Sequence, residues 1–401
     1  MRTGRRMPEW ASWNPAAAER PWTVGAEEEV MLLDPREWTL AGRGGDVLQA
    51  VRGTAAAHAS AETHSCVIEL ATRPHATAAA AAAELEEMRR ALAGVLRFRS
   101  GLCAAVAGTH PFAAWPDVQI SEGPRYRHIH ASLRELAQRE PTSALHVHVA
   151  VPDGEAAVRA LDGLRAVLPT LLALSANSPF WQGRDSGLAS ARTAIFSAFP
   201  RTGTARHFGS YAAYVDAVDE MLRCGAVPDY NFLWWDARLQ PRLGTVEVRI
   251  MDAQTRAGDT AALIALVQCL VALYAEGHGV PSRGTPETLA ENRFLAARDG
   301  MRTELIDLDR LVMRPVQEHL VSLLGECLPV ARELGCIAEL GAAARLAADP
   351  GDARQRALAG RLGLRGLVEA LAGEFVGDAC RSDRHARPPR GPHAIGATQR
   401  H

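Results

Sequence analysis

Four short segments of this chain alternate apolar residues with carboxylate, histidine or arginine side chains, and this alternation constrains the fold most. The segments are 23–32, 67–70, 145–151 and 245–250. Because successive side chains of a strand point to opposite faces, each segment predicts a strand with one apolar and one charged face. The charged faces would carry Glu27, Glu29, Glu69, His146, His148, Glu247 and Arg249. Glu28 falls on the apolar side of its segment and does not fit the pattern.

The charged faces have two interpretations. An antiparallel sheet with one face in water also alternates in this way. Such a solvated face usually mixes Thr, Ser, Lys, Gln and Arg, whereas acidic and histidine side chains dominate here. We therefore favour a sheet whose apolar face is covered by helices and whose charged face lines a concave site.

Helical spacing and helix propensity are found over much of the remaining sequence. They predict helices over 77–99, 154–176, 211–224, 259–277, 315–346 and 352–375, with Thr77 and Asp259 as candidate N-caps and the last two segments as helical hairpins. Together with the strands, this indicates an α+β fold. Residues 21–380 are expected to form one domain, and residues 1–20 and 381–401 to be disordered tails, because the tails lack hydrophobic periodicity.

Composition excludes several classes of function. All 44 basic residues are arginine, so a Walker A phosphate loop and pyridoxal or Schiff-base chemistry, which need lysine, are ruled out. A net charge of −2 gives no field that would attract nucleic acid or an anionic membrane. The longest uncharged apolar stretch, 260–275, is shorter than the roughly 20 residues of a membrane span. Seven scattered cysteines without a CxxC pair favour a reducing cytoplasm.

Carboxylates that face one cavity repel each other, so they persist there only if cations neutralise them. All-oxygen ligands favour Mg²⁺ or Mn²⁺ over Zn²⁺. The first candidate ligands are Glu27, Glu29, Glu69 and Glu247. Glu62 would join them if residues 62–64 turn into the following strand. Without lysine, ATP would be bound through the metal ions, with arginine on its phosphates. Arg249, beside Glu247, could hold a substrate carboxylate or a developing phosphate charge.

His146 and His148 leave a second reading open, because paired histidines on a strand also bind zinc in metal-dependent hydrolases. The sequence has no HExxH, GxSxG or GxGxxG motif to support a zinc protease, a serine hydrolase or a Rossmann dehydrogenase. Residues 174–187 leave a predicted helix for a loop bounded by Pro and Gly, which continues to Arg192 and has the composition of a binding loop.

Taken in order, eight motifs resemble one family. They are GAEEE at 25–29, VIELAT at 67–72, GTHPF at 108–112, HVHV at 146–149, LSANSPFWQGRDSG at 174–187, WDAR at 235–238, GTVEVRIMD at 244–252 and ENRF at 291–294. Over about residues 21–375 the chain is similar to the YbdK-type carboxylate–amine ligases, also called glutamate–cysteine ligase type 2. Two departures, Ser186 where Thr is usual and Ala191 where Ser or Tyr is common, would affect the amine pocket.

The resemblance implies a glutamine-synthetase-like fold, with a curved, mainly antiparallel sheet and helices on its outer face. It implies an ATP-dependent ligase with Mg²⁺ or Mn²⁺ that joins glutamate to cysteine or a related amine through an acyl phosphate. The small-molecule substrates would be its partners, with a homodimer as one possible assembly. The alternatives are an HxH metal-dependent hydrolase and a non-catalytic relative that binds an amino acid or nucleotide.

The roles implied for single residues fall into three groups. The metal ligands are Glu27, Glu29, Glu62, Glu69 and Glu247. The catalytic residues are Arg192 and Arg249. The substrate-binding residues are His146, His148, Asn177, Ser178, Asp236 and Arg238.

Overall fold

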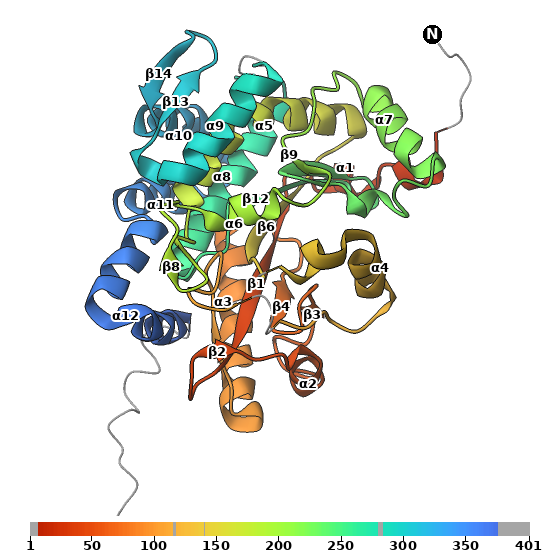
Figure 1. Cartoon of the computed structure of the whole chain (residues 1–401). Coiled ribbons are helices and arrows are strands. Elements are labelled where there is room, and N and C mark those ends of the chain that lie inside the picture. Colours follow the sequence, from red (N-terminus) through yellow and green to blue (C-terminus); the bar gives the residue numbers. More distant parts are fainter. Residues whose placement is uncertain (1–6, 115–117, 140, 280–283, 376–401) are drawn as a thin grey trace, which may run out of the picture.

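An eight-stranded antiparallel sheet forms the centre of the computed structural model, which describes residues 7–114, 118–139, 141–279 and 284–375 (Figure 1). The strand order is β11-β12-β6-β1-β4-β3, and β2 and β5 also pair with β1. The strands are β1 Val24–Asp34, β2 Thr39–Leu40, β3 Ser60–Ala61, β4 Val67–Ala71, β5 Cys103–Ala105, β6 Ala144–Ala150, β11 Ala237–Gln240 and β12 Thr245–Asp252. Because β1 is 11 residues long, it can pair with four neighbours.

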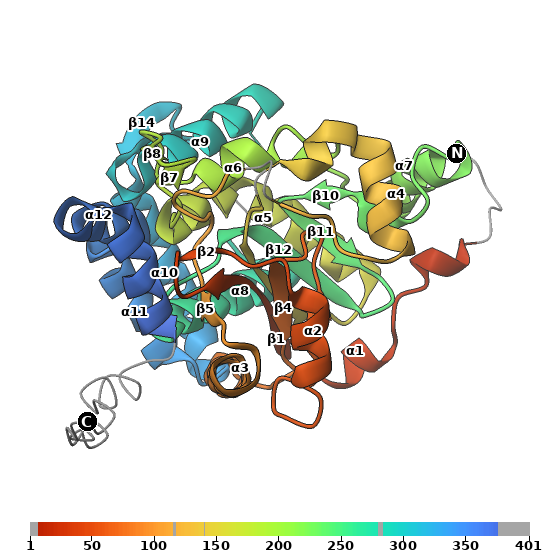
Figure 2. The ribbon, with the colours of Figure 1, turned by 60° about the horizontal axis from the view of Figure 1, so that its bottom comes forward.

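Three helices cover the apolar face of the sheet: α3 (Ala78–Val95), α5 (Gly154–Ser175) and α8 (Ala257–Ala275). Around α5 and α8 lie α9 Pro286–Asp299, α10 Val316–Glu333 and α11 Ile337–Ala348, and α12 Gly351–Phe375 packs at the side of β5 (Figures 1 and 2). The other helices are α1 Ala16–Glu19, α2 Gly44–Ala50, α4 Pro124–Leu133, α6 Ala191–Phe196 and α7 Tyr211–Arg223. Three small ribbons remain, β7 Phe180–Trp181 with β8 Arg184–Asp185, β9 Thr202–Gly203 with β10 Trp234–Trp235, and β13 Glu304–Asp307 with β14 Val312–Pro315.

The alternation in the sequence accounts for this layering. Val24, Val147 and Val248 are among the strand residues buried in one large core with α5 and α8. Val30 of β1 and Ile68 of β4 belong to a second buried core, which they form with α3. The expected α+β class, with a curved antiparallel sheet and helices on one face, is thereby confirmed. Thr77 caps α3 as predicted, accepting a hydrogen bond from the Ala80 amide at 3.3 Å. The predicted cap Asp259 is wrong: α8 begins at Ala257, and Asp259 lies in its first turn, paired with Arg354.

Among the described residues, α8 is the one helix long and apolar enough to cross a membrane by length and composition. Its 19 residues extend the apolar stretch recognised in the sequence. The helix packs against α3, α5, α10 and α11, and 78% of its most apolar window is buried inside the protein. The helix therefore has the surroundings of a core helix, because other helices of the protein contact its apolar side chains.

The expected N-terminal disordered tail is wrong for residues 7–20. Residues 9–11 form a short 3₁₀ helix and residues 16–19 form α1. The Trp13 indole donates a hydrogen bond to the Val151 carbonyl at 2.8 Å, and Ala17 is buried. Tryptophan side chains anchor this segment without helical or strand periodicity, which explains why the pattern missed it. Residues 1–6 and the predicted tail 381–401 lie outside the described residues.

Glu28, the residue that did not fit the strand pattern, forms a buried ion pair under the sheet. Its carboxylate accepts two hydrogen bonds from Arg89 of α3, one of them from Nε at 2.6 Å. Arg89 also donates to the carbonyls of Gln254 and Thr255, just before α8, at 2.7 and 2.9 Å. Both charged groups are almost fully buried. This pair therefore connects β1, α3 and the start of α8 through the interior.

We expect His110 to make the protein less stable at mildly acidic pH. Its Nε2 lies 2.9 Å from the Trp38 carbonyl, and its Nδ1 accepts the Ala113 amide at 3.0 Å, so the ring is held neutral. Burial lowers its pKa to about 4. The folded state then binds this proton less readily than the unfolded state, so stability is lost as the pH falls below about 6.5.

Between pH 7.5 and 5.5 this single group should remove about 1.3 kcal/mol from the free energy of unfolding. Urea denaturation of the parent and of His110→Gln at both pH values measures this effect. The variant should be less stable at pH 7.5 but should lack this component of the pH dependence. Equal pH slopes in the two proteins would contradict the prediction.

Candidate active site

The register of the sheet brings the predicted charged residues into one array. Across β12, β6 and β1, Glu247 pairs with His148, and His146 pairs with Glu27. One step further along β1, Glu29 pairs with Glu69 of β4. Residues separated by more than 200 positions therefore share one face of the sheet, as the alternation predicted.

A β-bulge in β12 adjusts this face. Between Val248 and Met251 the strand contains one residue more than the facing part of β6. Before the bulge, Glu247 lies on the charged face, and Arg249, within the bulge, forms an ion pair with it. After the bulge, Met251 pairs with Leu145 in the core. The bulge therefore returns the following residue, Asp252, to the charged side of the sheet, where it pairs with Ala144.

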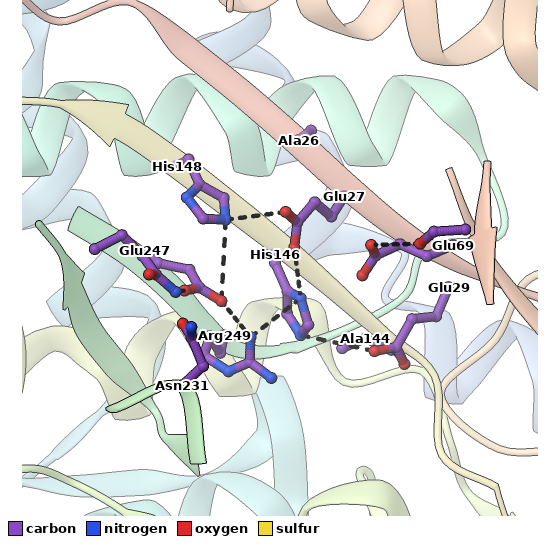
Figure 3. A network of polar contacts seen from close by, with 12 residues as sticks. Ala26, Glu27, Glu29, Glu69, Ala144, His146, His148, Asn231, Glu247 and Arg249 are labelled. Carbon is purple, nitrogen blue, oxygen red and sulfur yellow. Dashed lines mark hydrogen bonds and ion pairs between the residues drawn. The ribbon is translucent and has the colours of Figure 1, made fainter. Parts of the chain in front are cut away.

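Glu247 is fully buried and its carboxylate is surrounded by donors. Arg238 donates to both oxygens, at 2.7 and 3.1 Å, and Gln240 donates at 2.6 Å. Arg249 forms a further ion pair with Glu247 (Figure 3). Burial alone would raise the pKa of Glu247, but the neighbouring guanidinium groups hold it well below its usual range. The carboxylate oxygens of Glu247, which was predicted to be a metal ligand, are therefore occupied by hydrogen bonds and ion pairs with Arg238 and Arg249.

Glu27 lies between the two histidines. Its Oε2 is 3.2 Å from His146 Nδ1, and its Oε1 is 3.2 Å from His148 Nε2 (Figure 3). Burial raises the pKa of Glu27. The charge of His148 and the hydrogen bonds to both histidine rings lower this pKa by more than burial raises it, so the net change is a decrease. Burial and Arg249 lower the pKa of His146 to about 4, whereas Glu27 and Glu247 outweigh burial and raise that of His148. One histidine is thus neutral and the other is stabilised as a cation.

Glu29, Glu62 and Glu69 form a second cluster, which we call the carboxylate triad. Each offers an oxygen atom within 4.8 Å of the other two. Burial raises the pKa of Glu29 to about 8, with a further contribution from Glu62 that Arg192 partly offsets. Burial also raises the pKa of Glu62, and burial together with the neighbouring glutamates raises that of Glu69 well above its usual range.

The triad fits a divalent cation. Its three carboxylates bring oxygen atoms within 4.8 Å of one another, and hard oxygen ligands are those that Mg²⁺ or Mn²⁺ prefers. Burial together with the neighbouring glutamates raises the pKa of Glu69, which a bound cation would offset.

The expectation that Glu62 would reach the cluster depended on a turn over residues 62–64. The chain bends at Thr63 and turns at residues 65–66 before β4, and Glu62 lies with Glu29 and Glu69. Two further groups of potential ligands combine Glu27 with a histidine. A cation on His146 would lie beside Arg249, whose Nη1 is 3.4 Å from His146 Nδ1.

A cleft of about 370 Å³ contains the triad, Glu27 and His146. Arg192, Arg238 and Arg249 also line it. Arg192 uses its Nη atoms on the carbonyls of Ile250 and Arg249, both at 3.1 Å. The Nε atoms of Arg192 and Arg249 are buried and have no acceptor among the described residues. The cleft therefore combines an acidic cluster with unused cationic donors.

Comparison with known proteins identifies the family. A family model described as glutamate–cysteine ligase family 2 matches residues 23–382. A relative from Rubrobacter xylanophilus, named "Putative glutamate–cysteine ligase 2-3", is 42% identical over 362 residues, covering 88% of this chain and 97% of the relative. The chain belongs to glutamate–cysteine ligase family 2. A Roseiflexus castenholzii relative is 34% identical over 333 residues, covering 81% of this chain and 86% of its own.

The fold is shared with two solved structures. The glutamate–cysteine ligase of Francisella tularensis, in complex with AMP, has a TM-score of 0.65 at 14% identity, covering 88% of this chain and 89% of that one. A bifunctional glutathione synthetase from Pasteurella multocida has a TM-score of 0.63 at 13% identity, covering 90% of this chain and 53% of that one. At these identities the likeness concerns the fold alone. Membership of glutamate–cysteine ligase family 2 confirms the enzyme class expected from the sequence, an ATP-dependent ligase that forms a C–N bond.

In this family 2 member, Asn177 and Ser178 lie behind the cleft. Both are fully buried, and neither lines the cleft. The Asn177 amide and the Ser178 hydroxyl donate to Asp252 Oδ2 at 2.8 and 2.6 Å, and the Arg192 amide donates to Ser178 Oγ at 3.2 Å. Their contacts therefore hold the start of α6, which carries Arg192.

The carboxylate of Asp236 also accepts hydrogen bonds from another side chain of the protein and is not open to a substrate. Arg293 of α9 donates to both of its oxygens, at 2.7 and 3.0 Å. The side chain is almost fully buried and does not line the cleft. By contrast, Arg238 lines the cleft as expected, with its guanidinium against Glu247. The predicted site residues thus divide into those at the cleft and those that support it.

Sequence reasoning missed the wall opposite the sheet. Arg125 and Tyr126 of α4 line the cleft, as do Phe196 and Trp234. Arg125 lies close enough to Glu62 to lower its pKa. In the sequence, the RYR run at 125–127 shows only one aromatic residue between two basic ones, and no alternation or spacing connects it to the strands.

Proposed function

We propose that this protein uses ATP to join the γ-carboxylate of glutamate to the amine of cysteine or a related amine, through an acyl phosphate. The family assignment supports the ligase class. The observation that carries the rest is the pairing, in one cleft, of the buried carboxylate triad with the guanidinium groups of Arg192 and Arg249, whose Nε atoms have no acceptor among the described residues. A substrate with both phosphoryl and carboxylate oxygens would satisfy the arginines, and a cation would satisfy the triad.

Glu29, Glu62 and Glu69 would hold Mg²⁺ or Mn²⁺, which neutralises charge on the nucleotide phosphates when bound. Arg192 and Arg249 donate to substrate carboxylate or phosphoryl oxygens, where charge spreads during transfer. His146, which lines the cleft and contacts Glu27, would orient the substrate on its floor. His148 lies outside the cleft lining and would act by holding Glu27 from its other oxygen. Asn177, Ser178 and Asp252 keep Arg192 in place from behind.

The proposed chemistry has two steps. A carboxylate oxygen attacks the γ-phosphorus of ATP, so that ADP leaves and an acyl phosphate forms. The amine nitrogen then attacks the acyl carbon, inorganic phosphate leaves, and the amine loses a proton as the amide forms. The arginine donors favour both steps, because each step moves negative charge between oxygen atoms.

The nucleotide product tests this mechanism. With ATP, Mg²⁺ and glutamate, we expect ADP and inorganic phosphate to be released in equal amounts, and only when a suitable amine is present. Chromatography of the nucleotides, across a panel of amino acids and amines, measures this. Release of AMP and pyrophosphate would indicate an acyl adenylate instead. Product formation without nucleotide, by a protein that carries stoichiometric zinc, would favour the metal-dependent hydrolase.

A further inference from the structure

One side of the cleft is a continuous apolar surface. The side chains that form it line the cleft and also belong to one hydrophobic cluster; we call them the apolar wall, Tyr126, Ile129, Leu133, Phe196, Phe199 and Trp234. They come from α4, from the end of α6 and the residues after it, and from β10. The centre of the Phe199 ring lies 5.4 Å from that of Phe196 and 6.3 Å from that of Trp234. Three separate segments therefore join to form this surface.

The apolar wall lies directly beside the groups proposed to carry the reaction. Arg192 is one helical turn before Phe196 on α6, and its guanidinium carbon lies 5.7 Å from the centre of the Phe196 ring. On the side of the carboxylate triad, the Tyr126 hydroxyl donates to the carbonyl of Ala61, the residue before Glu62. A substrate held by Arg192 and by a cation on the triad therefore has the apolar wall within reach of its other atoms.

The apolar wall is open to a ligand. Tyr126, Phe196 and Phe199 are only partly buried, and Trp234, which is 8% exposed, also lines the cleft. Apolar ligand atoms that cover such a surface favour binding in proportion to the apolar area removed from water. Glutamate presents carboxylates to the arginines, and a cysteine side chain, with one methylene and one thiol, is too small to cover most of the wall.

The nucleotide has space on another side of the charged face. Glu27, which lies between the two histidines, also lines a separate cavity of about 390 Å³. Arg20, Thr72 and Thr245 help to enclose that cavity, and the six wall residues are absent from its lining. A nucleotide bound on that side of Glu27 would leave the apolar wall to the amine substrate.

We propose that the amine substrate carries an apolar body, branched aliphatic or aromatic and at least as large as a leucine side chain, which packs on the apolar wall. The inference rests on the proposed ligase function and narrows its amine from cysteine to this class. The apolar body lies against Phe196, Phe199 and Trp234. The nitrogen atom then points toward Arg192 and the triad, where the acyl phosphate is formed.

Turnover with matched amines tests this proposal. With ATP, Mg²⁺ and glutamate, we expect kcat/KM for L-leucine to exceed the values for L-cysteine and L-alanine at least tenfold, because the smaller side chains leave most of the wall uncovered. 3-Methylbutylamine should likewise exceed ethylamine, since the apolar body is the part recognised. Equal or better use of cysteine or alanine would overturn the proposal and leave the ligase function standing.

Phe199→Ala removes a ring that contacts two others of the wall. We expect it to raise KM for leucine at least tenfold and to leave KM for ATP and glutamate within twofold, whereas a purely structural defect would change all three. Phe199→Leu should restore most of the loss. Phe98→Ala, at an aromatic residue that is 80% exposed and outside the cleft, is the matched control and should behave as the parent. A raised KM for ATP instead would assign the wall to the purine and overturn the proposal.

Calorimetric titration of L-leucine into the full chain with Mg²⁺ separates this inference from the proposed reaction. Leucine binding that Phe199→Ala weakens at least tenfold supports the inference, and if no amine then releases ADP, only the ligase function fails. Binding that is unchanged in Phe199→Ala would place leucine elsewhere and overturn the inference. So would a parent that neither binds leucine up to about 10 mM nor turns it over.

Discussion

Replacing Glu69 with Gln should lower ADP release by about a thousandfold while leaving the protein folded. Loss of a metal ligand removes several kcal/mol of charge stabilisation in phosphoryl transfer. Burial, and after it the charges of the neighbouring glutamates, raise the pKa of Glu69 well above its usual range, and without metal the substitution removes this repulsion. We therefore expect the metal-free variant to melt at the same temperature as the parent or higher.

Thermal unfolding with and without Mg²⁺ measures the second half of this prediction. Mg²⁺ should raise the melting temperature of the parent but not that of Glu69→Gln, because only a bound ligand stabilises the folded state. Glu87→Gln, an exposed carboxylate on α3, is the control and should behave as the parent in both assays. Full activity in Glu69→Gln, or an unchanged response to Mg²⁺, would contradict the role of the triad.

Replacing Arg89 with Met should destabilise the protein by about 3–5 kcal/mol. The substitution leaves the Glu28 carboxylate buried without its partner, and it removes the donors to the carbonyls of Gln254 and Thr255. Urea denaturation at pH 7.5 measures the change in the free energy of unfolding. The neighbouring Arg90 is exposed, so Arg90→Met should change it by less than about 0.5 kcal/mol.

A double variant separates the lost ion pair from other causes. In Glu28→Leu/Arg89→Met the unpaired charge is gone, and an apolar pair in a buried position often restores stability. We expect the double variant to regain most of the loss, apart from the two carbonyls that still lack a donor. A double variant as unstable as Arg89→Met would show that Arg89 acts through packing rather than through its charge.

Local periodicity predicted the central strands and the charged face of the sheet. For Glu27, Glu29, His146 and Glu247, alternation alone fixed which side of a strand each residue occupies, because the opposite side had to be buried. Strand order and register came only with the structure, since nothing in a single segment states which neighbour it pairs with. The resemblance of the ordered motifs supplied the family.

Residues whose roles depend on distant partners could not be predicted. Glu28 looked like an error in the alternation because its partner, Arg89, lies 61 positions away on a helix. Asn177 and Ser178 lie in a loop with the composition of a binding loop, but Asp252 turns their polar groups inward. Arg125 reaches the cleft because α4 packs over it, and no spacing in the sequence indicates that contact.

The bulge in β12 has a consequence for recombining this chain with its relatives. In a regular strand, two residues five positions apart point to opposite faces. Because the bulge adds one residue, Glu247 and Asp252 instead reach the same side of the sheet. If recombination introduced a segment from a relative with one residue fewer at the bulge, every following residue of the strand would point to the opposite face of the sheet. Chimeras joined upstream of Val248 or downstream of Met251 keep the phase, provided that the bulge is inherited whole from one parent.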